Sequence, residues 1–504
     1  MDTASDRTRP YRPGWRVLLL AGPALAAFVP APALAETLQQ ALRAAYEGNP
    51  TLTAQRASVR AADESIPLAR AAGQPTVEGS VTYEENVLKG EVAPGGFFSN
   101  PDRQLVGSIN ASVPLLTFGA VRETVNAAEA RVSASQASLR GTESELFSAV
   151  VAAYMDVIRD EAIVRLNERN HEVMAYTLRE TRDRHAAGER PSSDVDQADA
   201  REALAASELE SARAKLITSR ESYIQLVGHA PGRLEAPQAL PPLPASPAAA
   251  VAAALENNPA VLTARSERAA AGYDVRAAGA EGMPRVNAIG SLNSYDYLGS
   301  LEAGTGPRNR DQGTTASVGL QLKVPFVQGG RVPALQRQAY ERQGVAIEKV
   351  TEAERLAVAE TRSAYATWRS SGAIVGTAQR GVAANTRALE SIRAQTDAGV
   401  RPLIDRLNAE QELLNAQVTL VTARRDAYVA GFALLAAMGQ AEAKALNLDG
   451  GPLYDPQTHL DQARAATRPF APTGSEPGAV AQGTQATPDQ TAELLTPMEP
   501  LVGP

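Results

Sequence analysis

An alternation of apolar and polar residues marks two segments of the chain, 104–116 and 315–326, and it is the cleaner in the second. In the second segment every even position is apolar, and in the first the odd positions are apolar or glycine. A period of two predicts β-strands with one apolar and one polar face. Less regular strands are expected just before them, over 76–87 and 285–298, with loops rich in glycine and proline joining each pair.

The alternation by itself fits two environments. An antiparallel sheet with one solvated face shows it, and so does a membrane barrel with apolar residues outward and polar residues inward. Tyr83, Tyr295 and Tyr297 in the weaker strands suit a membrane interface. A barrel needs at least about eight strands, so we expect several copies of the chain to share one barrel: three copies of four strands, or two copies of four.

Long helices are predicted after each strand pair. Residues 119–187 contain no proline and only Gly141 as an interior glycine, so they fit one helix of about 100 Å at 1.5 Å per residue. Residues 331–398 match them. Shorter helices are expected over 192–228 and 402–438, each entered through a Gly-x-Arg-Pro turn that makes an antiparallel hairpin.

Each hairpin leaves part of its long helix uncovered. A helix over 51–72, about 33 Å long, is expected to cover that part in the first hairpin, so each hairpin becomes a stacked coiled coil. Tyr154 and Tyr365 stand at helical spacing among apolar residues, and we expect them to be core anchors rather than ligand contacts.

The two hairpins belong to an internal repeat. Residues 39–228 recur at 248–439 with an offset of 211 for most of their length. A repeat of this length is too long for a solenoid unit, so each copy is interpreted as half of one architecture. The matched positions include Tyr154 with Tyr365, Gly188 with Gly399, and Asp194 with Asp405.

The first residues carry an export signal. Four arginines precede an apolar run over 17–29, and Ala33-Leu34-Ala35 offers a cleavage site before Glu36. The expected divisions of the chain are a signal peptide 1–35, a first repeat 36–236 with strands within 76–116, a proline-rich equatorial linker 237–247, a second repeat 248–440 with strands within 284–326, a C-terminal equatorial segment 441–463 and a disordered tail 464–504.

Composition removes several function classes. The chain has no cysteine, so it has no disulfide and no lipid-anchored cysteine, and no later segment approaches the roughly 20 apolar residues of a membrane helix. Membrane attachment is therefore expected through a barrel. The net charge of −8 argues against a nucleic-acid partner. Four scattered histidines and the lack of a phosphate loop indicate no enzyme, no cofactor and no metal: His171, His185, His229 and His459.

Several motifs together resemble the TolC family of outer-membrane export channels, most nearly its type I secretion branch. They are Val113-Pro114-Leu115-Leu116-Thr117-Phe118-Gly119, its echo Val324-Pro325-Phe326-Val327-Gln328-Gly329-Gly330, the two Gly-x-Arg-Pro turns, and Tyr454-Asp455-Pro456. The resemblance implies an α+β membrane protein in which a homotrimer forms a twelve-stranded outer-membrane β-barrel. A long α-helical coiled-coil tunnel would continue that barrel through the periplasm.

The resemblance also implies a function. The trimer would passively conduct substrates from an inner-membrane transporter of the ABC or RND type, through a periplasmic adaptor, to the cell exterior, in type I secretion or multidrug efflux. The helical turns would form the tip that docks the adaptor, with these residues: Gly188, Glu189, Arg190, Gly399 and Val400.

A gate is implied beside the same tip. By resemblance, Arg401 and Asp194 form the closing pair, and three copies of Asp405 form the constriction, with Asn408 at the second entrance position. The family's tyrosine before the turn is Thr396 in this chain, and its second entrance aspartate is Asn408, which predicts a looser and less negative gate. Alternatively, these charges are ordinary helix-start residues that favour the helix dipole.

Two other function classes are compatible with the pattern. A secreted helical filament subunit would share the long helices and the acidic charge, but it has no need for four barrel-like strands. A periplasmic scaffold or binding protein would keep the export signal and would fractionate without detergent. The sequence does not distinguish protein, drug or polysaccharide cargo.

Overall fold

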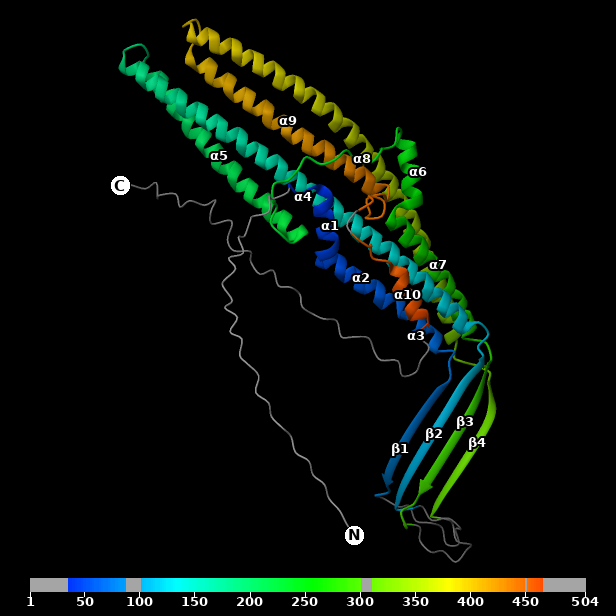
Figure 1. Ribbon diagram of the computed structural model, residues 1–504. Coiled ribbons are helices and arrows are strands. Elements are labelled where there is room, and N and C mark those ends of the chain that lie inside the picture. Colours follow the sequence, from blue (N-terminus) through cyan, green and yellow to red (C-terminus); the bar gives the residue numbers. More distant parts are fainter. Residues whose placement is uncertain (1–34, 88–100, 301–310, 449–450, 466–504) are drawn as a thin grey trace, which may run out of the picture.

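The computed structural model describes residues 35–87, 101–300, 311–448 and 451–465. A long bundle of helices is continued at one end by a curved sheet (Figure 1). Within the described residues, no helix is both long enough and apolar enough to cross a membrane. The expected signal peptide, apart from Ala35, and almost all of the expected tail lie outside the described residues.

The sheet joins the two sequence copies. β1 (Thr76–Glu85) and β2 (Arg103–Leu116) come from the first copy, while β3 (Arg285–Asp296) and β4 (Gln312–Lys323) come from the second. All neighbours are antiparallel in the order β1-β2-β3-β4. The pairing of β2 with β3 crosses from one copy to the other, and the expectation of two strands per copy is confirmed.

The register divides the sheet into two faces. The hydroxyls of Ser291 and Ser317 lie 2.8 Å apart across β3 and β4, and those of Ser80 and Ser108 lie 2.8 Å apart across β1 and β2. We call the side that carries them the polar face. Because strand side chains alternate, the positions between them form an apolar face, which exposes Val77, Val81, Ile109, Val318, Leu320 and Leu322 in the single chain.

The tyrosines expected at a membrane interface lie on both faces of the sheet. Tyr295 pairs with Gly313, and its parity along β3 is that of Ser291, so it belongs to the polar face. Its ring covers Gly313, where an added Cβ would stand 2.6 Å from the ring carbon that bears the hydroxyl. Tyr83 is on the apolar face, paired with Leu105, and is exposed. Tyr295 and Tyr83 therefore lie on opposite faces of the sheet, and their placement at a membrane interface stays a prediction.

Two helical hairpins make up most of the length. α4 (Ala120–Ala186) packs antiparallel on α5 (Ser192–Val227), and α8 (Arg331–Asp397) packs on α9 (Leu403–Ala437). α9 also lies along α4, so the hairpins are side by side (Figure 1). Glycines in the left-handed conformation precede both long helices, Gly119 with φ 88° and Gly330 with φ 76°.

Shorter helices cover the long ones on the side nearer the sheet. In the first copy these are α1 (Leu38–Gly48), α2 (Pro50–Asp63) and α3 (Ser65–Ala71); in the second they are α6 (Pro247–Asn257) and α7 (Pro259–Ala280). The expectation of one helix over 51–72 is wrong, because α2 ends before α3 begins. Proline at position 67 has no N–H to bond the carbonyl of residue 63 and its ring crowds that carbonyl.

The last described helix, α10 (Pro456–Ala465), packs against α2 and α3. Nδ1 of His459 lies 2.9 Å from Oδ2 of Asp63, whose side chain is fully buried, and Leu460 packs on Ile66. The later part of segment 441–463, expected at the equator, therefore runs along the helices toward the sheet. The contact joins residues almost 400 positions apart, so no local pattern reports it.

Tyrosine hydroxyls hold the linker between the copies. Tyr154 is fully buried, and its hydroxyl lies within hydrogen-bond distance of two carbonyl oxygens, those of Glu36 at 2.9 Å and Glu235 at 2.7 Å, which share its one proton. Tyr365 is partly buried, and its hydroxyl donates to the carbonyl of Ala245 at 2.9 Å. Both copies therefore use the same tyrosine as a packing residue that also fixes the chain around 235–245.

Candidate functional site

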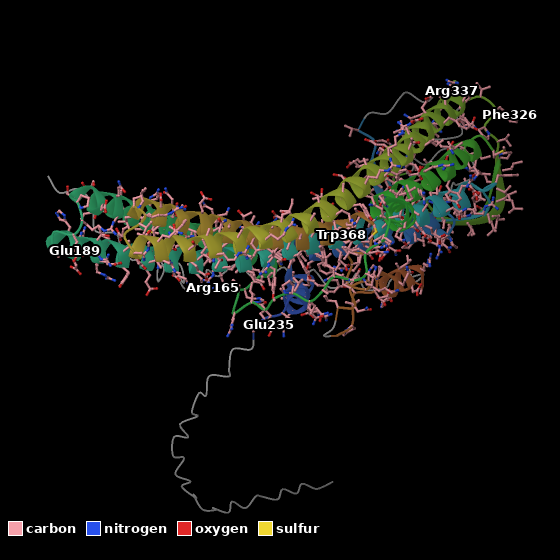
Figure 2. The ribbon with its side chains drawn as sticks, turned by 90° about the horizontal axis from the view of Figure 1, so that it is seen from above. Arg165, Glu189, Glu235, Phe326, Arg337 and Trp368 are labelled. Carbon is pink, nitrogen blue, oxygen red and sulfur yellow. The ribbon has the colours of Figure 1, made fainter. Side chains whose placement is uncertain are left out.

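The two hairpin turns form one end of the molecule. Figure 2 shows Glu189 at the end opposite Phe326 and Arg337, so the turns lie far from the strands. Gly188 and Gly399 take φ of 77° and 73°, and the amide after each glycine donates back to its helix, at 2.9 Å in both copies. This arrangement is a glycine C-cap, and it leaves Val400 at the tip, 75% exposed.

Of the expected gate residues, Asp194 lies in the first turn of α5, Arg401 lies just before α9, and Asp405 and Asn408 lie in the first turns of α9. Arg190 donates to Asp194 at 3.1 Å, and in the second copy Arg401 approaches Asp405 at 3.5 Å. In the described chain each arginine thus meets the carboxylate four residues ahead of it. The expected pair of Arg401 with Asp194 would form between different chains of the trimer, and it stays a prediction.

Asn408 has a partner that the sequence did not indicate. Its Oδ1 accepts a hydrogen bond from Arg201 of α5 at 2.7 Å. Nearby, NH1 of Arg406 lies 3.9 Å from Glu180 of α4 and 3.7 Å from Asp397 of α8. These contacts connect α9 to the first hairpin close to the tip, so Asn408 contributes to the union of the hairpins.

An apolar cluster supports the same contact. Leu403 and Leu407 of α9 are buried against Met174 of α4 and Ala205 of α5. Leucines four residues apart lie on one face of a helix, and that spacing was the available sequence signal for the contact. Its partners were not readable, since α4 and α5 lie in the other copy. Thr396 is also buried, which places the departure from the family's tyrosine inside the hairpin.

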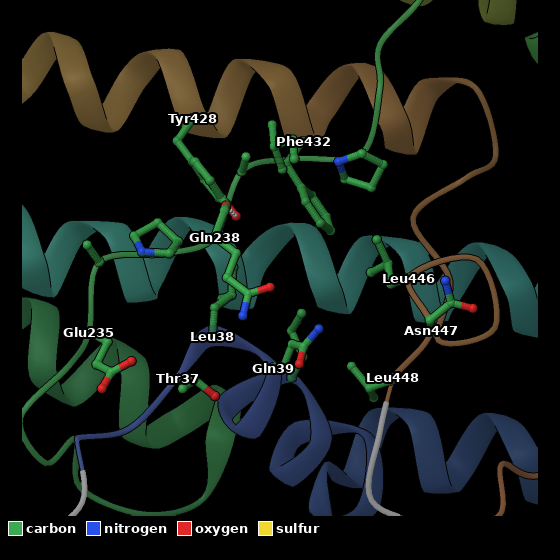
Figure 3. Close-up of a pocket in the computed structure, with 16 residues that line it drawn as sticks. Thr37, Leu38, Gln39, Glu235, Gln238, Tyr428, Phe432, Leu446, Asn447 and Leu448 are labelled. Carbon is green, nitrogen blue, oxygen red and sulfur yellow. Dashed lines mark hydrogen bonds between the residues drawn. The ribbon is translucent and has the colours of Figure 1, made fainter.

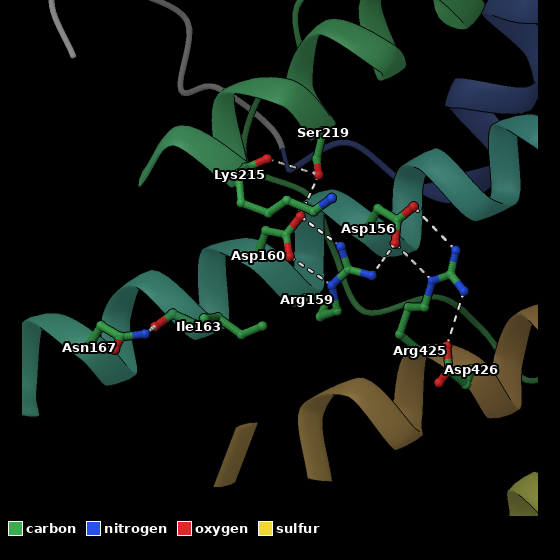
Figure 4. A network of polar contacts seen from close by, with 9 residues as sticks. All are labelled: Asp156, Arg159, Asp160, Ile163, Asn167, Lys215, Ser219, Arg425 and Asp426. Carbon is green, nitrogen blue, oxygen red and sulfur yellow. Dashed lines mark hydrogen bonds and ion pairs between the residues drawn. The ribbon is translucent and has the colours of Figure 1, made fainter. Parts of the chain in front are cut away.

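A second polar contact between the copies lies further from the tip. Arg425 of α9 bonds Asp156 of α4, which also receives Arg159 at 2.6 Å (Figure 4). Arg159 in turn donates to Asp160 at 2.7 and 2.8 Å, and Ser219 of α5 donates to the same carboxylate. The hydrogen bond to Asp160 raises the pKa of Arg159, as do the two nearby carboxylates.

A cavity of about 300 Å³ lies beside the linker (Figure 3). It lies between the start of α1, the linker, α9 and the segment 446–448. The hydroxyl of Tyr428 donates to the carbonyl of Gln238 at 3.1 Å, and burial raises the pKa of Tyr428 to about 12. The lining is mostly aliphatic and amide, which fits a packing gap between four segments rather than a reaction site.

The titratable groups form no reaction centre in the part of the chain that the structure describes. No group of three or more His, Cys, Asp or Glu residues there is arranged to hold a metal ion. The four histidines lie apart, each with a different partner: His171 with Glu202, His185 with the Arg190 carbonyl, His229 with Glu36, and His459 with Asp63.

Comparison with known proteins decides the family. The model of the outer membrane efflux protein family matches residues 41–229 and 250–440, one match per sequence copy. The chain belongs to the outer membrane efflux protein family. The outer membrane efflux protein BepC of Brucella suis is 33% identical over 432 residues, covering 85% of this chain and 90% of that protein. The outer membrane protein TolC of Escherichia coli is 24% identical and covers 92% of each chain.

Solved structures agree on the fold. The CmeC outer membrane channel of Campylobacter jejuni superposes with a TM-score of 0.71 at 16% identity, over 85% of this chain and 89% of that one. VceC of Vibrio cholerae gives 0.68 at 21% identity, over 80% and 96%. The fold class expected from the sequence is confirmed: a trimeric outer-membrane channel with four strands per chain and a long helical tunnel.

Membership in the outer membrane efflux protein family establishes the general function. The chain is an outer-membrane channel that extends into the periplasm and serves efflux or secretion, and it is not an enzyme. Channels of this family are trimeric and work with adaptors and inner-membrane transporters. The filament and scaffold alternatives are therefore set aside.

Proposed function

We propose that this chain conducts cargo from an inner-membrane ABC or RND transporter, with a periplasmic adaptor docked on the tip formed by Gly188, Glu189, Arg190, Gly399 and Val400. The observation that carries the proposal is the position of these turns at the end opposite the strands (Figure 2). Val400 exposes an apolar side chain there, and the left-handed glycines give both turns the same rigid shape.

The names of the relatives allow two kinds of cargo transport, efflux and secretion. BepC is named an efflux protein, and the alkaline protease secretion protein AprF of Pseudomonas aeruginosa is 31% identical over 195 residues. Both efflux and type I secretion therefore remain inside the proposal. The adaptor contact is common to both, which makes it the part to test first.

The docking test uses single cysteines, because the natural chain has none. Cysteine at Glu189 or Val400 is expected to crosslink to an adaptor in intact cells. Cysteine at Gln312, at the start of β4, is the matched control. Crosslinks that form from position 312 and not from the two turns would overturn the docking assignment.

The gate is proposed at the same end. Three copies of Asp405 would narrow the entrance, Arg401 and Asp194 would pair to close it, and Asn408 would stand at its rim. In support, Asp405 in the first turn of α9 and Arg401 just before that helix are both partly exposed, so their charges are available to the other chains of the trimer. Converging carboxylates at a narrow mouth favour cations by focusing negative potential.

We also propose that the mature chain begins at Glu36. Its carboxylate accepts a hydrogen bond from Tyr223 at 2.6 Å and approaches His229 at 2.9 Å. Its amide donates to the carbonyl of Arg233 at 2.8 Å. The first residue after the expected cleavage site is thus held through both its side chain and its backbone. Mass measurement of the N-terminal peptide from extracted protein tests this, and a peptide that begins before Glu36 would contradict it.

A further inference from the structure

Two cations face each other at the helix end of the sheet. Arg285, the first residue of β3, pairs in register with Lys323, the last residue of β4. Each lies an even number of positions from Ser291 or Ser317, so both belong to the polar face. Lys323 is exposed, and the side chain of Arg285 is 40% exposed. The positive charges therefore stand side by side on one surface.

This pair is unfavourable for the sheet itself. Like charges directly opposite each other on one face of an antiparallel pair are destabilising. One carboxylate offsets them in part: Glu281 accepts a hydrogen bond from Arg285 at 2.9 Å, and Arg331 lies 3.8 Å from its other oxygen. Glu281 is thus shared by two arginines, and among the described residues Lys323 has no ion-pair partner. A local rule broken without a packing gain is a mark of function rather than of stability.

The rest of this surface does not neutralise the pair. On the described polar face of β3 and β4, the remaining positions are uncharged: Asn287, Ile289, Ser291, Asn293 and Tyr295 on β3, and Gly313, Thr315, Ser317, Gly319 and Gln321 on β4. The polar face of β1 carries Glu78 and Glu84, and Glu78, the nearer of the two to Arg285, shares a register row with Ser291 through Asn110. That row lies six residues from Arg285.

The negative charge of Glu78 lies far from the positive charges of Arg285 and Lys323. Six residues of strand span about 20 Å, while the Debye length at physiological salt is about 8 Å. Glu78 therefore leaves the potential at Arg285 and Lys323 positive. Between them the polar face is hollowed by a space of about 420 Å³ that Glu78, Asn110, Ser291 and Ser317 help to line, so this face is the concave one.

In the trimeric channel the polar face of each sheet lines the lumen. We propose that Arg285 and Lys323 from three copies form a basic ring at the base of the barrel, which binds anionic groups of the passing cargo, carboxylate or phosphate, and favours anions. The inference rests on the proposed conduction. The basic ring adds a second charge filter, opposite in sign to the acidic entrance at Asp405. A narrow pore with low-dielectric walls strengthens the electrostatic potential at both filters.

The test is recording of the purified full chain in planar bilayers under a potassium chloride gradient. Substituting both residues, Arg285→Gln with Lys323→Gln, is expected to raise the cation-to-anion permeability ratio by at least about threefold, because focused charge sets local ion concentration. Lys323→Glu is expected to shift the ratio further. Lys444→Gln removes the same charge from the segment after α9, outside the sheet, and is expected to leave the ratio unchanged.

A second measurement begins with the unmodified chain. Inorganic pyrophosphate is expected to reduce the current of the unmodified channel, and Lys323→Gln is expected to weaken that block. Currents without block, together with variant ratios equal to that of the unmodified chain, would overturn the basic ring while leaving conduction intact. An unmodified trimer that carries no current would overturn the proposed function and the ring together.

Discussion

Arg425 of α9 donates to both carboxylate oxygens of Asp156 on α4, with Nε to Oδ1 at 2.8 Å and NH2 to Oδ2 at 3.2 Å. The two residues belong to different sequence copies, 269 positions apart. Paired guanidinium and carboxylate groups of this geometry are among the stronger protein hydrogen bonds. The pair therefore holds the second hairpin against the first at a fixed position along α4 and α9, far from the hairpin turns.

Removing the charge at Asp156 is expected to weaken this union. Asp156→Asn should lower the free energy of unfolding by about 1–3 kcal/mol, the range for hydrogen bonds to charged groups. The side chains are 22% and 25% exposed, so the deep-burial range does not apply. Denaturant unfolding of the extracted trimer measures the change. Glu168→Gln breaks an exposed pair with Arg213 and should cost less than about 1 kcal/mol; equal losses would contradict the assignment.

An introduced positive charge is expected to destabilise the trimer on one face of β4 and to be tolerated on the other. Val318→Arg puts a cation on the apolar face, which meets lipid in the assembled barrel, and should cost about 2–4 kcal/mol near the bilayer midplane. Ser317→Arg puts the same cation on the polar face and should be tolerated. Native gels of outer-membrane extracts report the trimer fraction. Loss of trimer from Ser317→Arg alone would mean that the faces are reversed.

The gate proposal predicts two separate electrical changes. Arg401→Ala should raise single-channel conductance, because the closing pair with Asp194 is lost, although an exposed pair contributes only about 1 kcal/mol. Asp405→Ala should reduce the preference for cations, because the converging carboxylates are lost. Asp461→Ala removes a charge from α10, where the side chain is 73% exposed, and should change neither property. Unmodified currents in both gate variants would leave the gate without support.

Glu143 predicts a pH dependence of stability. Burial raises the pKa of this carboxyl above 4.5, even though it accepts a hydrogen bond from the amide of Ala443. A raised folded-state pKa means that the stability contribution is full below the unfolded value and is lost as pH rises through the folded value. The unfolding midpoint should therefore fall as pH rises from about 4.

Glu143→Gln keeps the acceptor oxygen and removes the ionisation. The variant should match the unmodified chain at acidic pH and be the more stable of the two at neutral pH, with the gap opening above about pH 4. Thermal unfolding from pH 4 to pH 8 measures it. Glu145→Gln changes an exposed carboxylate on the same helix and serves as the control. A constant gap across the range would refute the linkage.

Replacing glycine by alanine is expected to change the stability in opposite directions at two positions of the chain. Gly329 has φ 56°, so Gly329→Ala should cost about 1–2 kcal/mol for a left-handed residue with a Cβ. Gly344 lies inside α8 and an added Cβ there meets nothing within 4 Å, so Gly344→Ala should stabilise by about 0.5–1 kcal/mol. Thermal unfolding of the two variants compares them directly. Shifts of the same sign would show that backbone conformation does not dominate at these positions.

Much of the architecture was determined by the sequence alone, because its signals are local. Alternation over 315–326 needs only neighbouring side chains, and it indicated one apolar and one polar face before any pairing was known. The glycine and proline of each hairpin turn act through their own backbone angles, so Gly188 and Gly399 marked both tips. The offset of 211 residues made the second copy a repetition of the first.

The tertiary structure alone decided which distant residues meet. Arg285 opposes Lys323 because of a strand register, and a shift of one residue would move Lys323 to the other face. Arg201 reaches Asn408, and Arg425 reaches Asp156, because two copies of one hairpin lie side by side. Such contacts depend on the free energy of packing whole elements, which periodicity within one element does not report. For that reason the basic ring and the fastening of the hairpins emerged only from the fold.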